Sequence, residues 1–435
     1  MPEPDLAAAA LAVLRDNWRG GDGPGTGGRG GHTVPSRRLY PHQWSWDSAF
    51  TAIGWAHAAP RRARAELESL LAAQWADGRV PQIVFSPAVP RDAYFPGPDF
   101  WRARSPSGAE TTGLVQPPVH ARAAWEVHRA DPRAGARFLR RVYPALVAQH
   151  EYLRRERSDE AGLAVVLHPW ETGLDNSPAW DGELARVPAA VGPVSGTRRD
   201  LGQVVAAERP TQADYARYLA LAARYRDGGY RDAEVRPGHP FSVTDPLFNA
   251  VLGWSEEALA EIAGVVGAPP QPHRRRAAEI RDALLARHLD PVQGTFHARH
   301  GDGALDREHT VGGLVPLVLD LPPAVVDGLV RELTGPRFGL DDRGPLPSHD
   351  RTGDAFDPSR YWRGPAWVNT SWLVWRGLRR HGRTAEAATL RAGVLAAVRA
   401  GGFREYFDPT TGAGRGAVDF GWTAALTLDL LATVP

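Results

Sequence analysis

Apolar and polar residues recur with a helical period along most of the chain. In the segment 134–156 one face is apolar and the opposite face carries arginines. The apolar face consists of Phe138, Leu139, Val142, Leu146 and Leu153. The same period predicts about a dozen further helices, over 5–18, 47–59, 61–76, 117–130, 211–227, 255–267, 273–288, 309–320, 322–333, 364–381, 384–400 and 418–434. The pattern therefore predicts an all-α protein whose helices form a toroid.

Long segments rich in proline and glycine join these predicted helices. They cover 19–46, 78–116, 168–210, 290–308 and 335–363. Strand patterns are scarce, and 163–167 is the best of them. Long connections usually carry function, so we expect the active site in loops that gather at one mouth of the toroid. The glycine-rich stretch 20–31 is the exception. Its low complexity predicts a flexible loop. A phosphate-binding loop is disfavoured, because no strand pattern precedes the stretch and no Lys-Ser/Thr follows it.

Composition narrows the class of protein. The 435 residues are 43% hydrophobic and 23% charged, which is typical of a packed globular chain. A net charge of +1 gives no reason to expect nucleic acid or an acidic membrane as a partner. The absence of cysteine excludes disulfides and thiolate metal sites. With neither a signal-peptide pattern nor an apolar run of about 18 residues, the expected location is the cytoplasm.

Fifteen tryptophans stand out, because several lie within a few residues of a carboxylate in the glycine- and proline-rich segments. Core packing explains some of them, but sugar-binding clefts also combine aromatic faces with polar groups. Breaking a glycosidic bond requires two carboxyl groups, one to protonate the leaving oxygen and one to activate water or attack carbon. The carboxylates beside these tryptophans are therefore the candidates for catalysis.

The first candidate segment is HPWETGLDNSPAWD, 168–181, which holds Glu171, Asp175 and Asp181. Trp170 and Trp180 flank these carboxyl groups. An Asx turn would explain Asp175 and Asn176 structurally, but not the neighbouring Trp-Glu and Trp-Asp pairs.

The second segment is FREYFDP, 403–409, with Glu405 between Arg404 and Tyr406. The third, YPHQWSWDSAF, contains Asp47, which we expect to cap the following helix and also to bind sugar hydroxyls. In the fourth, YWRGPAWVN, Gly364-Pro365 is expected to open a helix. Arg363 would then stand at a helix start, where a cation is poorly placed unless a ligand or carboxylate binds it. Gln82 and Gln116 could add amide hydrogen bonds.

Rival chemistries lack their motifs. The fifteen histidines are scattered without an HExxH spacing, and no GxSxG sequence occurs. We therefore expect neither a metal nor a cofactor.

Six motifs in this order resemble glycoside hydrolase family 63, above all its compact bacterial members, the mannosylglycerate and glucosylglycerate hydrolases. The motifs are WSWDSAF, PWETGLDNSPAWD, ERPTQADYARYLAL, YWRGPAWVN, EYFDPTTG and FGWTAAL. The resemblance spans roughly residues 39–430. It implies one (α/α)6-barrel catalytic domain over 1–435, inversion at an α-anomeric centre and no metal.

By motif position the resemblance implies Asp175 as general acid and Glu405 as general base. It also implies sugar binding near Trp46, Asp47, Gln116, Trp362, Arg363, Trp367 and Trp422. Further candidates from the same segments are Tyr40, Trp44, Gln82, Trp170, Glu171, Asn176 and Trp180. Asp175 needs a raised pKa, supplied by Trp170 and Trp180 or a second carboxylate, and Glu405 needs a cation, Arg404 or Arg363.

The expected partner is a small carbohydrate: an α-glucoside or α-mannoside, with glucosylglycerate or mannosylglycerate favoured by the resemblance. An acidic aglycone would need an arginine, for which the candidates are Arg37, Arg38, Arg198 and Arg199. A trehalase-like or debranching α-glucosidase is the alternative activity, and a catalytically inactive sugar-binding protein is the alternative class. The oligomeric state, the roles of Glu171 and Asp181, and the role of the loop 187–210 stay open.

Overall fold

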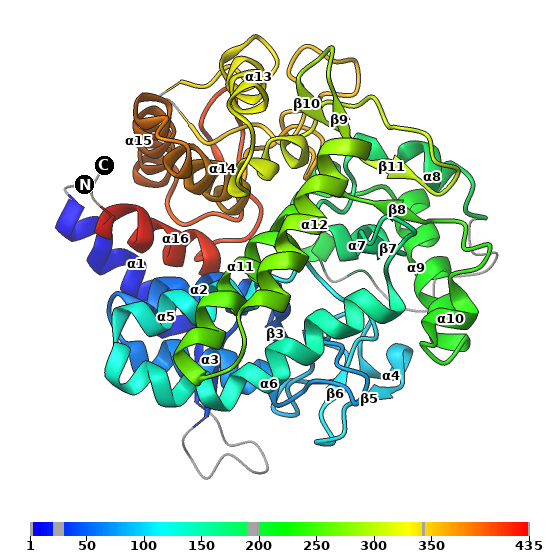
Figure 1. The fold of residues 1–435 in the computed structure, drawn as a ribbon, viewed down its shortest axis with the longest axis vertical. Helices are drawn as coiled ribbons and strands as arrows, with labels where there is room; N and C mark the ends of the chain where they lie inside the picture. Colours follow the sequence, from blue (N-terminus) through cyan, green and yellow to red (C-terminus); the bar gives the residue numbers. More distant parts are fainter. Residues whose placement is uncertain (1–2, 21–29, 189–197, 199, 342–343, 434–435) are drawn as a thin grey trace. The chain divides into compact units, whose positions relative to one another are not determined.

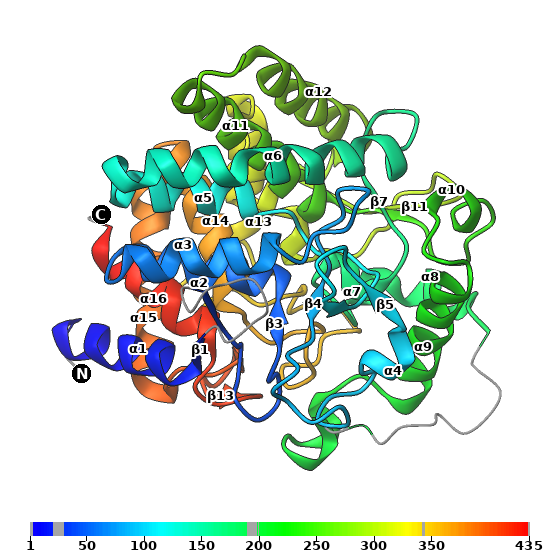
Figure 2. The same cartoon turned by 90° about the horizontal axis from the view of Figure 1, so that it is seen from below.

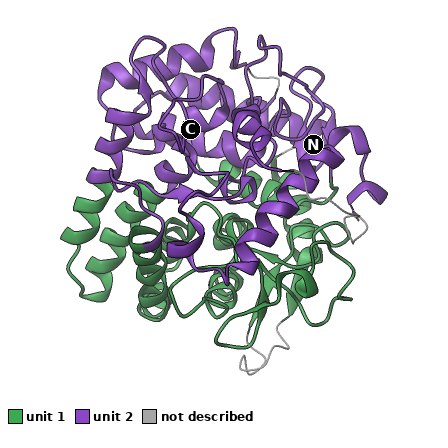
Figure 3. Ribbon diagram, turned by 90° about the vertical axis from the view of Figure 1, so that its right-hand side faces the viewer, with its two compact units in different colours: residues 1–155, 252–278, 417–434 green, residues 156–251, 279–416, 435 purple. Residues whose placement is uncertain are grey.

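The structure is a computed structural model of the whole chain, and it describes residues 3–20, 30–188, 198, 200–341 and 344–433. The longest elements are α-helices, and long loops join many of them (Figure 1). The chain divides into two compact units, which Figure 3 distinguishes by colour. Unit 1 comprises 1–155, 252–278 and 417–434, and unit 2 comprises 156–251, 279–416 and 435.

Unit 1 is built mainly of helices. They are α1 (Glu3–Asn17), α2 (Ser45–Ala56), α3 (Pro60–Leu71), α4 (Pro98–Trp101), α5 (His120–Ala130), α6 (Pro132–Glu156, whose last residue belongs to unit 2) and α16 (Gly421–Ala432). Its strands are β1 (Trp18–Gly20), β2 (Gly31–Thr33), β3 (Gln43–Trp44), β4 (Ile83–Val84), β5 (Ala103–Arg104) and β6 (Glu110–Thr111). The order β3-β4-β6-β5 makes one antiparallel sheet, and β1 pairs with β2.

Unit 2 carries longer loops between its elements. Its helices are α7 (Pro169–Thr172), α8 (Asp181–Ala185), α9 (Gln212–Asp227), α10 (Asp232–Val235), α13 (Pro323–Thr334), α14 (Val368–Arg380) and α15 (Thr384–Gly401). Its 3-10 turns are η1 (Pro178–Trp180), η2 (Asp200–Gly202), η3 (Ala206–Glu208), η4 (Val311–Gly313) and η5 (Val315–Val318). Its strands are β7 (Val165–Val166), β8 (Val243–Thr244), β9 (Leu289–Asp290), β10 (Thr295–Phe296), β11 (Arg299–His300), β12 (Tyr406–Phe407) and β13 (Gly414–Arg415). The chain passes between the units within α11 (Pro246–Val266) and α12 (Gln271–Arg287).

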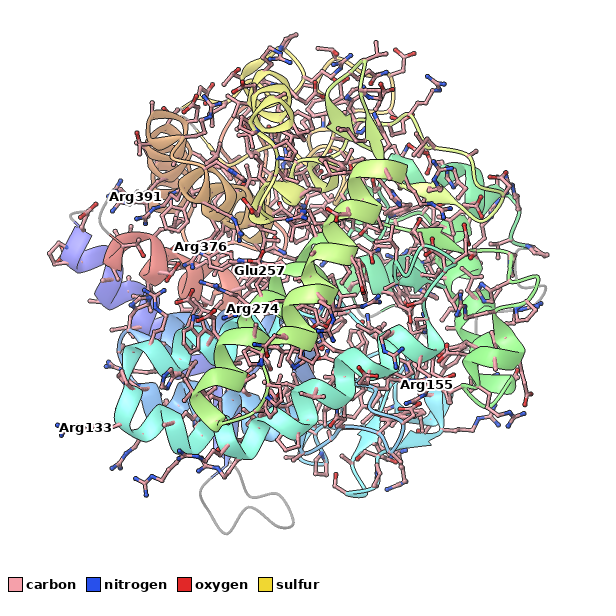
Figure 4. The ribbon with its side chains drawn as sticks, in the orientation of Figure 1. Arg133, Arg155, Glu257, Arg274, Arg376 and Arg391 are labelled. Atoms are coloured by element: carbon pink, nitrogen blue, oxygen red, sulfur yellow. The ribbon has the colours of Figure 1, made fainter. Side chains whose placement is uncertain are left out.

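The helical period explains which faces are buried. In α6 the predicted apolar residues 138, 139, 142, 146 and 153 are all buried, as expected for an amphipathic helix. Arg133 and Arg155 lie on its exposed side, and both are labelled in Figure 4. Every residue of α2 is buried, because other elements of unit 1 cover it all round. A Cβ added at Gly54 would stand 2.4 Å from the Cα of Ala425, so glycine allows α2 and α16 their close approach, visible in Figure 2.

Three helix predictions were wrong in type or position. The helix predicted from residue 255 is α11, which already begins at Pro246. The predicted helix over 309–320 consists of the 3-10 turns η4 and η5, because Gly312-Gly313 and Pro316 interrupt an α-helix. The helix expected from 364 begins only at Val368. The backbone before it is engaged elsewhere: Gly364 and Pro365 accept hydrogen bonds from the Ser348 amide.

No helix within the described ranges is long and apolar enough to cross a membrane.

Candidate active site

Asp175 follows a short helix whose start is fixed by a neutral histidine. The Nδ1 of His168 accepts a hydrogen bond from the Trp170 amide at 3.0 Å, and its Nε2 lies 2.9 Å from the Tyr218 carbonyl. Burial lowers the pKa of His168 to about 4, so the ring is neutral and accepts at one nitrogen while donating at the other. Gly173 ends α7 with a φ of 77° and turns the chain toward Asp175.

Hydrogen bonds hold the turn around Asp175 from both sides. The hydroxyl of Tyr218, on α9, donates to the Asp175 carbonyl at 3.1 Å. The indole of Trp180 donates to the Leu174 carbonyl at 2.7 Å. Both bonds fix the turn through main-chain acceptors, and neither uses the Asp175 carboxyl group.

The surroundings of Asp175 favour its protonated form. Loss of solvation is the main cause that raises the pKa of Asp175 to about 7, and the negative charge of Glu405 adds to it. The positive charge of Arg209 acts in the opposite direction. The predicted raised pKa is confirmed, and both predicted kinds of cause, a dry setting and a second carboxylate, contribute.

Glu405 is buried and pairs with an arginine. Its Oε1 lies 3.3 Å from Nη1 of Arg209, and its Oε2 lies 3.2 Å from Nη2. Both side chains are almost fully buried, with 3% and 1% of their surfaces exposed for Arg209 and Glu405. The guanidinium also lies 4.6 Å from the ring centre of Tyr361, a cation–π contact. Glu405 is therefore a buried carboxylate that has its own countercharge.

The sequence analysis proposed Arg404 or Arg363 as the cation near Glu405 and did not name Arg209. Arg404 donates to the Gly414 carbonyl at 3.3 Å, and Arg363 forms a salt bridge with Asp181 at 2.7 Å. The cation was missed because Arg209 lies 196 residues before Glu405 in the sequence. A signal was present: Arg209 opens the run RPTQAD, in which Thr211 and Asp214 form the capping box that starts α9.

Aromatic rings surround the pair of Arg209 and Glu405. Tyr406 contacts Tyr361 at 5.7 Å and Trp367 at 4.7 Å between ring centres. Trp362 stacks on Trp367 at 3.9 Å and 4°. Main-chain hydrogen bonds between Ala366 and Phe407, at 2.7 and 2.9 Å, join the tryptophan segment to β12. The second and fourth sequence motifs are thus brought together in unit 2.

Arg363 precedes α14 instead of starting it, so its expected unfavourable placement at a helix start does not arise. Its two terminal nitrogens bind both oxygens of Asp181, at 2.8 and 2.7 Å. The nearby amide of Trp362 donates to the Asn176 side chain at 2.9 Å. These bonds tie the segment of Asp175 to the segment of Trp362.

Two polar atoms next to Asp175 have no partner within the described part of the chain. They are the Nδ2 of Asn176 and the hydroxyl oxygen of Ser177, both buried. Buried donors of this kind are normally satisfied by protein, water or ligand. They are therefore available to a bound molecule beside Asp175.

Glu171 and Trp180 have structural surroundings. Glu171 is fully buried, and Arg157 binds its two oxygens at 2.8 and 2.9 Å. Arg157 also binds Asp232 at 2.5 Å, so one buried guanidinium holds two carboxylates. Trp180 is fully buried as well, at an edge contact with Phe241. Trp170 lies against Tyr215 and Tyr218 of α9.

The remaining candidates belong to unit 1 and form an aromatic cluster there. Tyr40 and Trp44 contact each other at 5.4 Å, and Tyr94, which the sequence analysis missed, contacts both at 6.5 and 5.6 Å. All three are partly exposed, as suits rings that meet a ligand. Trp46 contacts Trp422 at 5.4 Å, and both are buried.

Asp47 does not cap its helix as predicted. The residue at the cap position of α2 is Trp44, and no side chain caps the helix there. Asp47 lies in the first turn, where a negative charge interacts favourably with the helix dipole. Gln116 accepts a hydrogen bond from the Trp46 amide at 3.3 Å, and the main-chain carbonyl of Gln82 accepts one from Ser45 at 2.9 Å. Both glutamines thus position the start of α2.

The four arginines expected near an acidic aglycone differ in their surroundings. Arg198 is enclosed, with Asp200 at 2.6 Å and the Tyr215 ring at 4.4 Å. Arg37 is exposed and lies 4.0 Å from Asp16, and Arg38 is exposed. Arg199 and most of the glycine-rich stretch 20–31 lie outside the described residues. Among the residues that are described, no three His, Asp or Glu side chains are grouped to hold a metal ion.

Known proteins are similar to this chain over nearly its whole length. Residues 40–423 match the family described as the mannosylglycerate hydrolase MGH1-like glycoside hydrolase domain. The chain is 40% identical to the mannosylglycerate hydrolase of Rubrobacter radiotolerans, over 98% of this chain and 97% of that protein. It is 34% identical to the glucosylglycerate hydrolase of Mycolicibacterium hassiacum, over 98% and 97%. The crystal structure of the GH63 mannosylglycerate hydrolase from Thermus thermophilus in complex with Tris and D-glycerate superposes with a TM-score of 0.88, at 38% identity over 97% of this chain and 99% of that one.

Proposed function

The chain belongs to the mannosylglycerate hydrolase MGH1-like family of glycoside hydrolases, and from this premise we propose that it hydrolyses a small α-glycoside of glycerate with inversion at the anomeric carbon. Relatives named for mannosylglycerate and for glucosylglycerate both match. Mannose and glucose are therefore both proposed as the sugar, with exo-action on one terminal residue.

The observation that carries the proposal is the contrast between two carboxyl groups in unit 2. Asp175 has a pKa raised to about 7, chiefly by loss of solvation. Glu405 forms a salt bridge with Arg209. Carboxyl groups whose environments differ in this way are typical of an acid and a base acting in one reaction.

In the proposed mechanism Asp175 gives its proton to the glycosidic oxygen as the bond to the anomeric carbon breaks. Glu405 takes a proton from a water molecule, and the oxygen of that water attacks the anomeric carbon from the opposite face. The products are the sugar with inverted configuration and free glycerate. We propose a separation of about 6.5–9.5 Å between the two carboxyl groups, which leaves room for the water.

Roles in sugar binding are proposed for the aromatic and amide side chains of the motifs. They are Tyr40, Trp44, Trp46, Asp47, Gln82, Gln116, Trp170, Asn176, Trp362, Arg363, Trp367 and Trp422. The partly exposed rings of Tyr40 and Trp44 support stacking against a sugar, and the unsatisfied Asn176 amide supports a hydrogen bond to a hydroxyl. Glu171 and Trp180 are fully buried, so for these two residues we propose structural roles instead of substrate binding.

A panel of substrates tests the assignment. We expect release of glycerate from mannosylglycerate or glucosylglycerate and little hydrolysis of neutral α-disaccharides such as trehalose. Cleavage of trehalose alone would favour the trehalase-like alternative. If every α-glycoside is inert while sugar still binds, the chain is a sugar-binding member of the family.

The cation that meets the aglycone is tested separately. Arg198 is buried against Asp200, whereas Arg37 and Arg38 are exposed, so we propose the two exposed arginines for binding the carboxylate. Replacing the correct one by Ala should raise KM for the acidic glycoside and spare a neutral aryl glycoside. If both variants leave both KM values unchanged, neither residue has this role.

The role of Asp175 can be separated from that of Glu405 by the leaving group. Asp175→Asn should lower kcat by about 10²- to 10⁴-fold for a glycoside whose leaving group needs a proton. The loss should be much smaller for a nitrophenyl glycoside, because that leaving group departs without protonation. Equal losses for both substrates would contradict the acid role.

We further propose that the chain is one catalytic domain whose helices close into an (α/α)6 barrel. The support is the superposition over 97% of the chain and the interleaving of both units along the sequence. A single calorimetric unfolding transition is expected, and two independent transitions would contradict a single domain.

A further inference from the structure

We propose that Arg415 is a positioning residue: it fixes the segment that carries Arg209 and thereby holds Arg209 against Glu405. The proposal rests on the function proposed above, in which Glu405 is the base. Arg415 lies ten residues after Glu405 and outside the group of side chains assigned to sugar or acid–base chemistry.

The guanidinium of Arg415 bridges two carboxylates from different segments. Its Nη1 binds Oε1 of Glu208 at 2.6 Å, and its Nη2 binds Oδ2 of Asp408 at 2.8 Å. Glu208 and Asp408 are buried, whereas Arg415 is partly exposed. Charge-assisted bonds of this length to buried carboxylates are strong and directional.

One end of the bridge is a rigid turn. The second oxygen of Asp408 accepts the amides of Thr410 and Thr411 at 2.9 and 3.0 Å. Burial works against the charge of Asp408, but the hydrogen bonds from Arg415, Thr410 and Thr411 outweigh it and lower its pKa. Asp408 is thus a fixed anion at the β12–β13 hairpin, in which Tyr406 pairs with Arg415 across the strands.

The other end of the bridge is next to Arg209. Glu208 closes the turn η3 and immediately precedes Arg209, and the Tyr406 hydroxyl lies 3.5 Å from the Glu208 carbonyl. The side chain of Arg209 then reaches Glu405, the residue immediately before strand β12. Two salt bridges therefore join the same two segments side by side, Arg415 to Glu208 and Arg209 to Glu405.

Close packing around Glu405 makes the position of its carboxyl group sensitive to the salt bridges of Arg415. A Cβ added at Gly416, the residue after Arg415, would lie 2.5 Å from Oε2 of Glu405. The hairpin backbone thus packs directly on the carboxylate. A shift of the Arg415 segment changes where Glu405 and Arg209 meet, and a misplacement near 1 Å can cost about 100-fold in rate.

Arg415→Gln is the variant that tests the proposal, with Arg337→Gln as the matched control. Arg337 also bridges two carboxylates of unit 2, Glu332 at 3.0 Å and Asp350 at 3.2 Å, without contacting the proposed catalytic pair. We expect Arg415→Gln to lower kcat by about 10- to 100-fold with a smaller change in KM. The alkaline limb of its pH–rate profile should move to higher pH, because the charge of Arg209 lowers the pKa of Asp175 and a displaced Arg209 lowers it less. Arg337→Gln should keep the wild-type kcat and profile.

Two milder variants keep the test decisive if Arg415→Gln does not fold. Arg415→Lys keeps one contact at a time and should recover part of kcat. Glu208→Gln should show the same shift of the alkaline limb in weaker form. The proposal is overturned if Arg415→Gln and Arg337→Gln have equal kcat values and equal pH–rate profiles although the Tm of both is lowered. Arg415 would then be a purely structural residue.

Crystal structures of the variants separate this inference from the function it rests on. If the wild-type enzyme cleaves no α-glycoside, the proposed function fails, and the distance between Arg209 and Glu405 still decides the positioning role. In the Arg415 variant that folds, we expect that pair to separate beyond about 4 Å, the limit of a salt bridge. An undisturbed pair near 3.2–3.3 Å would refute the inference.

Discussion

Replacing Asp175 by Asn should stabilise the protein while it removes activity. The pKa of Asp175 is raised from 3.8 to about 7, mainly because its surroundings solvate the charged form poorly. At a pH where the Asp175 carboxyl group is ionised, this poor solvation destabilises the native state, and the protein tolerates the loss because the group serves catalysis. The neutral amide of Asn has nearly the same shape and lacks that cost.

The magnitude follows from the shift. Roughly three pH units at about 1.4 kcal/mol each give about 4 kcal/mol, and the partial exposure of Asp175 reduces this to about 2–4 kcal/mol. The sign is set by proton binding. Between pH 3.8 and about 7 the native state binds more protons at Asp175 than the unfolded state, so stability falls as pH rises through this window. The contribution is fully present below pH 3.8 and fully lost above about pH 7.

The assay is urea unfolding of both proteins at several pH values from about 4 to 8. The free energy of unfolding of Asp175→Asn minus that of wild type should grow with pH and level off above about pH 7. Any change in hydrogen bonding adds a constant at all pH values and does not alter this slope. A difference that is flat across the range would refute the raised pKa, and a difference that falls with pH would reverse its sign.

Three further predictions concern Glu405, Gly416 and Glu171. Glu405→Gln should lower kcat by at least about 100-fold for poor and activated leaving groups alike, as measured by glycerate and nitrophenol release; retained activity on either would contradict the base role. Gly416→Ala should lower kcat by about 10-fold or more, because its Cβ would lie 2.5 Å from Oε2 of Glu405. Gly412→Ala is the control: its φ of +73° is close to the +65° of Gly416, but the space around it is open, so it should lose stability only. Equal kcat values for the two variants would contradict the close packing. Glu171→Gln should cost about 3–5 kcal/mol in urea unfolding because it leaves Arg157 buried with half its countercharge, and normal stability with lost activity would instead indicate a role in catalysis.

Local sequence patterns predicted much of the helical architecture. The apolar face of α6 was predicted residue by residue, because a long amphipathic helix is specified by its own period. The segment 361–367 was not, since Gly364-Pro365 is a helix-start signal that tertiary hydrogen bonds to Ser348 and Phe407 override. Propensity is a weak guide where a segment's main chain bonds to distant strands.

The candidate site shows the same limit. The segments that hold Asp175 and Glu405 could be selected from their aromatic residues and turns, but only the family resemblance favoured Asp175 over Glu171 and Asp181. Their electrostatic partners could not, since Arg209 reaches Glu405 and Arg157 reaches Glu171 only through the fold. The partner of Arg363, Asp181, was among the candidates, but as an unassigned carboxylate.

The anomeric configuration of the first product is the most direct test of the central claim, that Asp175 and Glu405 act as acid and base in a single displacement. Proton NMR should follow hydrolysis of an α-mannosyl- or α-glucosylglycerate from the first minutes, before mutarotation equilibrates the sugar. We predict that the β-anomer appears first and the α-anomer grows in later by mutarotation. Initial release of the α-anomer would contradict the account, because retention requires a covalent intermediate and carboxyl groups only about 5–5.5 Å apart.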